Sequence, residues 1–267
     1  TYRTIKRGVF FIALFYSLSL CCAPSVNEKR HTIASSQLGT NTSIQVVIPD
    51  SYVHSSSTYP VLFVLDSQRY LLQAVAHQQS LRFKDRSPEM IIVGIDTTQQ
   101  DRRRWFYSEP EPFIAYLSNE LVPWVDERYR TSGERVYFGW ELAAGLATDI
   151  MVQRQDLFDG YILASPTRIN AARLGSVDKY ISRKHTTSWG YVTLGQVESW
   201  SVSSVETLID TLSSSTYTNW QFEMLDDFDH YSSPLITLNK GLLRYFSDYP
   251  SLRFYSINEF HHFGGLG

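Results

Sequence analysis

The feature that most constrains this fold is a series of short, continuously apolar runs that alternate with amphipathic segments. Residues 59–65 (YPVLFVL) and 90–95 (MIIVGI) have almost no polar side chain, as expected of strands buried on both faces of a parallel sheet. Residues 113–125 place an apolar side chain at every fourth position, which is the stripe of an amphipathic helix. Alternation of such segments predicts an α/β fold with a mostly parallel central sheet and helices on both faces.

The same patterns predict one domain over residues 32–249. Two leading strands, 32–38 and 44–48, are expected to form an antiparallel edge of the sheet. Residues 250–267 form a C-terminal extension, which we interpret as the start of a truncated region. Further strands are expected at 136–138, 161–164, 191–194 and 221–225, and helices at 70–81, 142–153, 205–212 and 234–246.

The first 23 residues have the pattern of a secretory signal peptide. Lys6 and Arg7 precede an apolar run over residues 9–20, and the cysteine pair Cys21-Cys22 follows. The run is shorter than the roughly 20 residues that span a bilayer as a helix. We therefore expect an exported protein that is periplasmic or lipid-anchored at a bacterial membrane, with residues 25–30 as a linker. Lipidation at Cys21 or Cys22 stays open, because residues 18–21 resemble a lipobox with Leu20 in place of a small residue.

Composition excludes several classes of function. Both cysteines lie in the leader, so the mature domain has neither a thiol nucleophile nor an internal disulfide. A net charge of −3 argues against nucleic acid as a partner. The dense basic run 102–104, followed by the aromatic residues 105–107, is interpreted as a solvated loop with an aromatic anchor. The glycine patterns of nucleotide-binding loops are absent from the sequence, so no cofactor is expected.

Polar residues follow four of the predicted strands, and ligands of such sheets bind beyond the carboxyl ends of the strands. These strand ends are residues 66–68, 139–141, 195–198 and 227–230. The last two supply a carboxylate and then a histidine, after the strand-to-helix turn at Gly139. This is the order of nucleophile, acid and base in α/β-hydrolases.

Several segments resemble the putative esterase family of α/β-hydrolases, which includes enterochelin esterases and relatives of esterase D. The similar segments are YPVLFVLDSQRY (59–70), FIAYLSNELVPWVDERYRT (113–131), DLFDGYILASPT (156–167) and DHYSSPLITLNKGLLRYF (229–246). The resemblance implies an α/β-hydrolase fold and a serine carboxylesterase ancestry, with esters, thioesters or siderophore-type lactones as substrates.

Residue by residue, the resemblance assigns the base to His230 and the acid to Glu198. It assigns the oxyanion hole to the backbone amides of Ser67 or Gln68 and of Leu142. The family pattern at the nucleophile turn is G-x-S-x-G, whereas this chain has Gly139-Trp140-Glu141-Leu142-Ala143. Glu141 therefore stands where the family has its serine.

This replacement has a direct chemical consequence. Acyl transfer needs a hydroxyl or thiol that a histidine can deprotonate. Attack of a carboxylate on an ester would give an anhydride, and its charge would lie beside the donors meant for the oxyanion. We expect an ion pair between Glu141 and His230 in the space of the acyl group, with Trp140 packed over the pocket.

Three hypotheses follow for a small-molecule, ester-like ligand or substrate. In the first, the chain is a degenerate hydrolase that binds without hydrolysing. In the second, Glu141 attacks an sp³ carbon, as the aspartate of haloalkane dehalogenases and epoxide hydrolases does. In the third, the chain is an active esterase with a displaced nucleophile, Ser165 or Ser67. Whether the chain is an enzyme stays open among them.

The remaining candidates receive simpler interpretations. Residues 97–111 and 168–184 are expected to be specificity loops. His77 and His185 are expected to be surface residues. The acidic residues of 226–229 and the pair His261-His262 lack the spacing of metal ligands, so no metal is expected.

Overall fold

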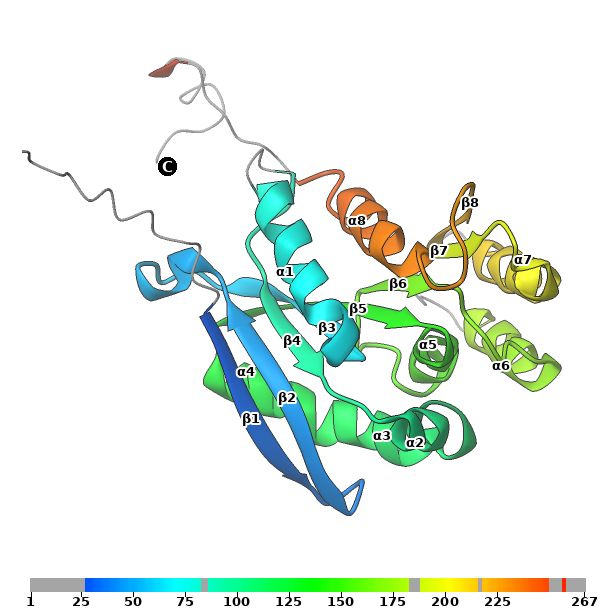
Figure 1. Ribbon diagram of the computed structural model, residues 1–267, viewed down its shortest axis with the longest axis horizontal. Coiled ribbons are helices and arrows are strands. Elements are labelled where there is room, and N and C mark those ends of the chain that lie inside the picture. The colour runs from blue at the N-terminus through cyan, green and yellow to red at the C-terminus, as the bar shows by residue number, and fades with distance from the viewer. Residues whose placement is uncertain (1–26, 83–85, 183–187, 216–217, 250–255, 258–267) are drawn as a thin grey trace, which may run out of the picture.

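Eight strands form one sheet in this computed structural model, which describes residues 27–82, 86–182, 188–215, 218–249 and 256–257 (Figure 1). In chain order the strands are β1 (Asn27–Ser35), β2 (Thr40–Ile48), β3 (Tyr59–Leu65), β4 (Ile91–Ile95), β5 (Thr131–Trp140), β6 (Gly160–Ala164), β7 (Ser188–Gly195) and β8 (Thr218–Leu225). Their order across the sheet is β1-β2-β4-β3-β5-β6-β7-β8.

The sheet is parallel from β4 to β8 and antiparallel at its N-terminal edge. The pairs β1–β2 and β2–β4 are antiparallel, and the other neighbours run in the same direction. The predicted fold class is therefore confirmed. The boundaries of the two leading strands were wrong: both begin four or five residues earlier than predicted, and residues 27–30, expected in a linker, belong to β1 and pair with the end of β2.

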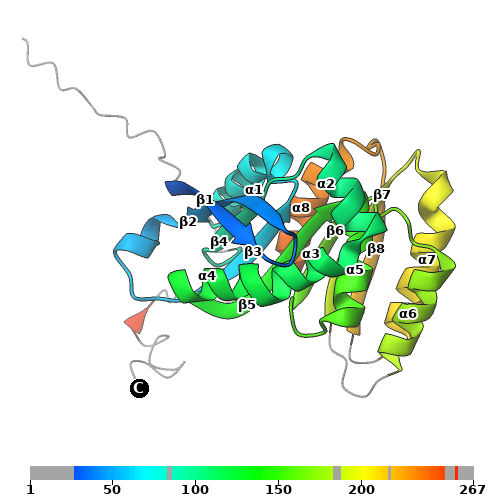
Figure 2. The ribbon, with the colours of Figure 1, turned by 90° about the horizontal axis from the view of Figure 1, so that it is seen from below.

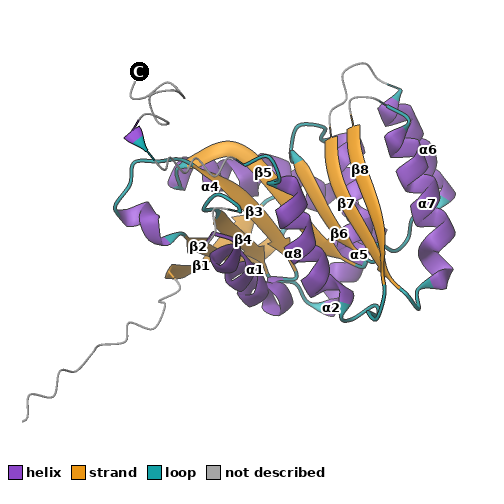
Figure 3. Ribbon diagram, turned by 90° about the horizontal axis from the view of Figure 1, so that it is seen from above, coloured by secondary structure: helices purple, strands orange, loops and turns teal. Residues whose placement is uncertain are grey.

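Helices cover both faces of this sheet. They are α1 (Ser67–Arg82), α2 (Gln99–Arg103), α3 (Pro110–Tyr116), α4 (Val122–Arg128), α5 (Leu142–Gln153), α6 (Ala171–Ile181), α7 (Ser199–Ser213) and α8 (Ser233–Tyr245), with shorter turns η1 (Asp50–Val53), η2 (Arg104–Ser108) and η3 (Leu117–Leu121). Helices α1 and α8 lie on one face, as the view from above shows (Figure 3). The other helices pack on the opposite face, which the view from below presents (Figure 2).

The continuous apolar runs of the strands are explained by this two-sided cover. In β3, Leu62 and Val64 join the core beneath α1 and α8, whereas Val61, Phe63 and Leu65 join the core on the other face. All of β3 is buried. A strand between two helical layers has no face on which a polar side chain would be solvated.

The helical segment predicted over 113–125 extends from α3 through η3 to α4. Its expected stripe is confirmed, because Phe113, Leu117, Leu121 and Val125 are all fully buried. The middle turn, η3, has π-helical hydrogen bonding, a local widening that periodicity does not reveal.

The two segments expected to be loops contain helices, so that expectation was wrong. Helix α2 begins with a capping box in which Thr98 and Asp101 bond each other's backbone amides. Helix α6 begins after Asn170, whose side chain accepts from the Arg173 amide. These caps satisfy amides that the first helical turn leaves free. Helix α2 has no apolar residue, whereas α6 places Leu174, Val177 and Ile181 at helical spacing.

Strained backbone is concentrated at the carboxyl edge of the sheet. Five described residues other than glycine have positive φ, and all follow parallel strands: Asp66, Glu141, Ser165, Arg168 and Asp227. Such conformations are costly for residues with a Cβ and cluster at functional sites. The carboxyl edge of the sheet is therefore the expected location of a functional site.

Several expectations lie outside the described residues. These are the signal peptide over 1–23, the pairs Cys21-Cys22 and His261-His262, His185 and nearly all of the extension 250–267. Within the described part of the chain, no helix has both the length and the apolar character needed to cross a bilayer.

Candidate active site

Glu141 occupies the sharp turn between β5 and α5. Its backbone has φ 56° and ψ −112°, its amide donates to the Ala164 carbonyl, and its own carbonyl accepts from the Thr167 amide. Gly139 permits the close approach of strand and helix, because a Cβ there would meet the Ala143 carbonyl carbon at 2.8 Å. The turn thus keeps the geometry of a nucleophile elbow while it presents a carboxylate.

The Glu141 carboxylate is bound by Arg102 of α2. An Nη1 atom of Arg102 donates to Oε2 of Glu141 at 2.8 Å. The Nε atom of the same guanidinium contacts both carboxylate oxygens of Asp66, at 3.0 and 2.9 Å. The Arg102 and Asp66 side chains are only 4% and 0% exposed, so this is an ion cluster with two carboxylates around one buried cation.

This cluster corrects two expectations. Among the described residues, Glu141 forms its ion pair with Arg102 and not with His230. Arg102 is permanently charged, whereas a histidine is a cation only when protonated, so the guanidinium is the stronger partner. The run 102–104 is not a solvated loop at its first residue, although Trp105 and Phe106 are buried as the expected aromatic anchor.

The pKa values of Asp66 and Arg102 are both raised in this cluster. Burial raises the pKa of Asp66 despite the opposing effects of Arg102 and of a hydrogen bond from Thr97. Burial by itself would lower the pKa of Arg102, but the charges and hydrogen bonds of Asp66 and Glu141 outweigh it and raise that pKa. The guanidinium is thus a fixed cation beneath the elbow.

His230 and Glu198 lie together, as their predicted roles require. Nδ1 of His230 is 2.6 Å from Oε1 of Glu198. The other carboxylate oxygen accepts from Oγ of Ser165 at 2.7 Å and from the Gly195 amide at 2.5 Å. Burial would raise the pKa of Glu198, but hydrogen bonds from His230, Ser165 and Gly195 prevail and lower it. Glu198 is therefore held as an anion behind the imidazole.

Aromatic rings surround His230. The ring centroids of Trp140, Tyr231 and Trp200 are 5.0, 5.2 and 6.0 Å from that of His230. Nε1 of Trp140 donates to the His230 carbonyl at 2.8 Å. Trp140 is buried, so it supports the histidine from within and does not form an outer cover of the pocket, as had been expected.

The residues expected to form the oxyanion hole lie at the first turns of two helices. Ser67 and Gln68 begin α1 directly after β3, and Leu142 begins α5 directly after Glu141. Amides in a first helical turn have no intrahelical acceptor. The side chains of Ser67 and Gln68 bond Asp96 and Thr97, which ties this turn to the end of β4.

Neither serine proposed as a displaced nucleophile is accessible. Ser165 is 0% exposed and bonds Glu198 and Ser233, and Ser67 is 3% exposed and donates to Asp96. A buried hydroxyl that is already engaged cannot receive an ester. The structure thus removes the support for the third hypothesis.

An open cleft of about 990 Å³ lies over the elbow. Its floor includes Glu141 and Leu142, and its walls come from η2, the loop between β6 and α6, and the start of α7. The wall residues are Arg103, Tyr107, Ser108, Thr167, Arg168, Ile169, Asn170, Trp200, Ser201 and Ser204. The cleft therefore has a carboxylate floor and a mixed cationic and aromatic wall.

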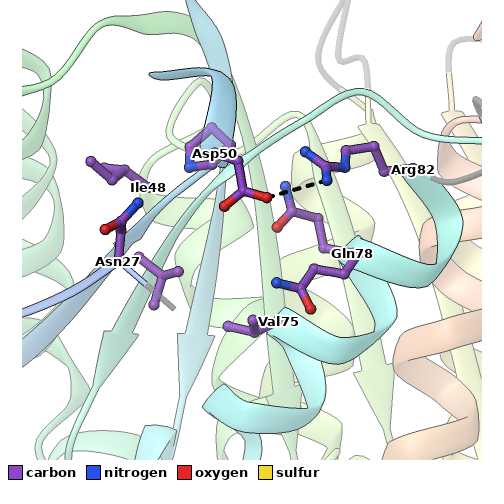
Figure 4. Close-up of a pocket in the computed structure, with 9 residues that line it drawn as sticks. Asn27, Ile48, Asp50, Val75, Gln78 and Arg82 are labelled. Atoms are coloured by element: carbon purple, nitrogen blue, oxygen red, sulfur yellow. Dashed lines mark hydrogen bonds and ion pairs between the residues drawn. The ribbon is translucent and has the colours of Figure 1, made fainter. Parts of the chain in front are cut away.

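A second pocket, of only about 20 Å³, lies at the opposite edge of the sheet (Figure 4). Figure 4 shows Gln78 of α1 between Asp50 and Arg82, which form an ion pair at its rim. This edge holds the amino ends of the parallel strands. A pocket of about one water molecule at that edge has neither the volume nor the position of a substrate site.

In the segments that the structure describes, no group of three or more histidine, cysteine, aspartate or glutamate side chains is arranged to hold a metal ion. His77, expected at the surface, is half-buried and contacts Asn239 of α8. The functional residues that sequence reasoning missed are Asp66 and Arg102. Asp66 had a signal, since it ends a buried strand, but Arg102 had none beyond its position in a basic run.

Comparisons with known proteins agree with this geometry. A sequence model described as Putative esterase matches residues 35–223. The chain belongs to the putative esterase family. This match covers every strand from β2 to β7, the elbow and Glu198, whereas His230 lies beyond its end.

The solved structures similar to this esterase-family chain include three described as hydrolases or esterases, all at low sequence identity. An IroE-like serine hydrolase from Shewanella oneidensis is 18% identical with a TM-score of 0.75, over 90% of this chain and 87% of the other. A siderophore hydrolase from Aspergillus nidulans is 17% identical with a TM-score of 0.72, over 86% and 97%. The enterobactin esterase of Shigella flexneri is 15% identical with a TM-score of 0.71, over 85% and 61%.

At these identities the similarity establishes the α/β-hydrolase fold of this family member. No curated protein matches the chain significantly. The fold and family are thus established, and the chemistry must be argued from the site itself.

Proposed function

We propose that this esterase-family protein binds a small, ester-like ligand and does not hydrolyse it by the serine mechanism. The observation that carries the proposal is the Arg102–Glu141 ion pair at the elbow, with Arg102 also bound to Asp66. The residue at the nucleophile position thus belongs to a charge cluster that also contains the buried side chains of Arg102 and Asp66.

Ester hydrolysis requires a neutral nucleophile that gives its proton to His230. A carboxylate bound to a guanidinium has no proton to give, and its attack on an ester carbonyl would produce an anhydride. A second negative charge would also develop beside Glu141 in the transition state, where the family needs donors. Both effects oppose acyl transfer at this elbow.

The pair of His230 and Glu198, the base side of the site, nevertheless has the contact that an acid and a base require. His230 contacts Glu198, and the cleft over the elbow is open to solvent. The neighbours that are siderophore or enterobactin hydrolases suggest that the ligand contains an ester or a related carbonyl group. Recognition without turnover then explains why the cleft persists while the nucleophile does not.

The Arg102 contact also weighs against a carboxylate nucleophile that attacks an sp³ carbon. Such a nucleophile needs an oxygen with a free, unshared charge, and the guanidinium draws that charge toward Oε2 of Glu141. Covalent adducts on Glu141 should therefore be absent when the protein is incubated with alkyl halides and epoxides and its intact mass is measured.

The test of the proposal is turnover of short p-nitrophenyl esters. We expect the wild-type protein to match a His230→Ala control, because no step would depend on the histidine. Binding should be measured in parallel, with the same esters as ligands in titration calorimetry. Turnover by the wild type that disappears in His230→Ala would overturn the proposal.

We also propose that the protein is exported, on the basis of the leader pattern in residues 1–23. The full chain expressed in a Gram-negative host should appear in the periplasmic or membrane fraction. Retention in the membrane fraction that is lost when Cys21 and Cys22 are both replaced by serine would identify the lipid-anchored form. A chain found only in the cytoplasm with an intact leader would contradict export.

A further inference from the structure

Two arginines line the cleft without a carboxylate partner. Arg103 comes from the end of α2 and Arg168 from the loop between β6 and α6. Neither forms an ion pair with any residue that the structure describes, whereas the adjacent Arg104 pairs with Glu109. Glu141 is the one described carboxylate in the lining, and Arg102 already binds it.

Arg168 is held in place and is not simply a solvated side chain. Its backbone has φ 61°, a conformation that persists in non-glycine residues only where the surroundings enforce it. Its guanidinium lies 4.7 Å from the centre of the Tyr107 ring across the cleft wall. Stacking on an aromatic ring fixes the direction of the guanidinium and leaves its edge free to donate.

Exposed aromatic side chains also belong to this region. Trp200 lines the cleft and is 63% exposed, and Tyr231 is 76% exposed. Both rings lie against His230. Single exposed apolar residues are ordinary, but two exposed rings against one histidine, one of them in the cleft lining, offer a surface for a flat apolar group.

A negative group is disfavoured at the elbow, because the Glu141 carboxylate belongs to the lining there. An anionic headgroup would therefore be bound by Arg103 and Arg168, with its apolar part against Trp200. Thr167 also lines the cleft, and its Oγ1 is buried with no partner among the described residues. The lining thus combines unpaired cations with an exposed aromatic ring.

We propose that the ligand of this cleft is an amphiphilic anion. Its flat apolar group packs on Trp200, and its carboxylate or phosphate headgroup binds Arg103 and Arg168. This inference rests on the proposed function, since it concerns the ligand that the protein binds without turnover. It adds an anionic headgroup to the ester-like ligand proposed above, because guanidinium donors to an anion are about twice as strong as those to a neutral oxygen.

The test compares matched probes by titration calorimetry with the full chain. The probes are 2-naphthoate, 2-naphthyl phosphate and methyl 2-naphthoate, which share one ring system and differ in headgroup charge. We expect at least one anion to bind about tenfold or more tightly than the methyl ester. The tighter of the two anions identifies the headgroup as carboxylate or phosphate.

Variants locate the headgroup. Arg168→Gln and Arg103→Gln should each weaken binding of the preferred anion by about tenfold and leave the methyl ester unchanged. Arg128→Gln is the matched control, because Arg128 is also stacked on a ring, 4.6 Å from the centre of Trp124, but ends α4 at the other edge of the sheet. Glu141→Gln should strengthen anion binding, since it removes the negative charge of the floor.

Several outcomes would overturn the inference. They are equal affinity for the anions and the ester, no measurable binding of any probe at millimolar concentration, or anion binding that Arg128→Gln weakens as much as Arg168→Gln. The release of 2-naphthoate from the methyl ester is measured in the same samples. His230-dependent release would contradict the proposed function, while the anion affinities would still decide the inference by themselves.

Discussion

The two halves of the site, the nucleophile side with Asp66, Arg102 and Glu141 and the base side with Glu198 and His230, shift the pKa of a buried carboxylate in opposite directions. On the nucleophile side, burial raises the pKa of Asp66 although Arg102 and Thr97 both bind its carboxylate. On the base side, hydrogen bonds from His230, Ser165 and Gly195 outweigh burial and lower the pKa of Glu198. The base side therefore has an anion held behind an imidazole, and the nucleophile side has two carboxylates around one guanidinium. Under the proposed function, Glu141 is part of that ion cluster and not a nucleophile.

The largest effect should follow from removing the cation of the ion cluster. Arg102→Met leaves Asp66 and Glu141 facing each other without compensation, and breaking a buried ion pair in this way costs about 3–5 kcal/mol. Urea unfolding at neutral pH would measure the loss. The control is Arg104→Met, whose exposed pair with Glu109 should contribute at most about 1 kcal/mol. Equal losses in the two variants would show that the cluster has no special role.

A smaller but more informative effect should come from restoring the hydroxyl. Glu141→Ser supplies a nucleophile beside His230 and leaves Arg102 paired with Asp66 alone. We expect p-nitrophenyl ester turnover about 100-fold above the same variant with His230→Ala, the lower range for a general base. If the two are equally inactive, the base side has drifted as well, and the comparison drawn above fails.

The smallest effect concerns the base side and depends on pH. The folded pKa of Glu198 is depressed, so its stabilising contribution is present above its ordinary value near 4.3 and is lost as pH falls through the lower folded pKa. Glu198→Gln should lower the free energy of unfolding by about 1–3 kcal/mol at neutral pH.

Urea unfolding of the wild type and of Glu198→Gln at a series of pH values measures how this difference in the free energy of unfolding depends on pH. The difference between them should shrink as pH falls below about 4.3, because the unfolded chain then takes up a proton at Glu198 that the folded protein still excludes, and it should vanish below the lower folded pKa. A difference that stays constant between pH 3 and pH 7 would mean that Glu198 stabilises the fold by packing and not by charge.

Much of the fold was predictable because its causes are local. The apolar runs placed β3 correctly at both ends, and the residues between Leu142 and Gln153 form the predicted helix. Burial on one or two faces leaves a periodicity in the sequence itself. The short helix α2 was missed because it depends on a polar cap and contains no apolar residue, whereas α6 was missed although Leu174, Val177 and Ile181 have helical spacing.

In the candidate site, too, residues marked by a local pattern were predicted, whereas a contact between distant parts of the chain was not. Glu141, Glu198 and His230 were predicted as site residues because each comes soon after a predicted strand and their order is that of the fold, and the contact between His230 and Glu198 agrees with this prediction. The partner of Glu141 was predicted wrongly. Arg102 is 36 positions from Asp66 and 39 from Glu141 in sequence, and no local pattern links residues that far apart.

The sequence by itself determined the order of the strands and of most helices, the resemblance to the family and the position of Glu141 at the strand-to-helix turn. Only the tertiary structure decided which cation that carboxylate meets, because α2 packs back over the ends of β3 and β5 and brings Arg102 to both acids. It also decided that Trp200 and Arg168 lie on the walls of one cleft. The physical reason is that strand and helix formation depend on neighbours in the chain, whereas charge pairing depends on neighbours in space.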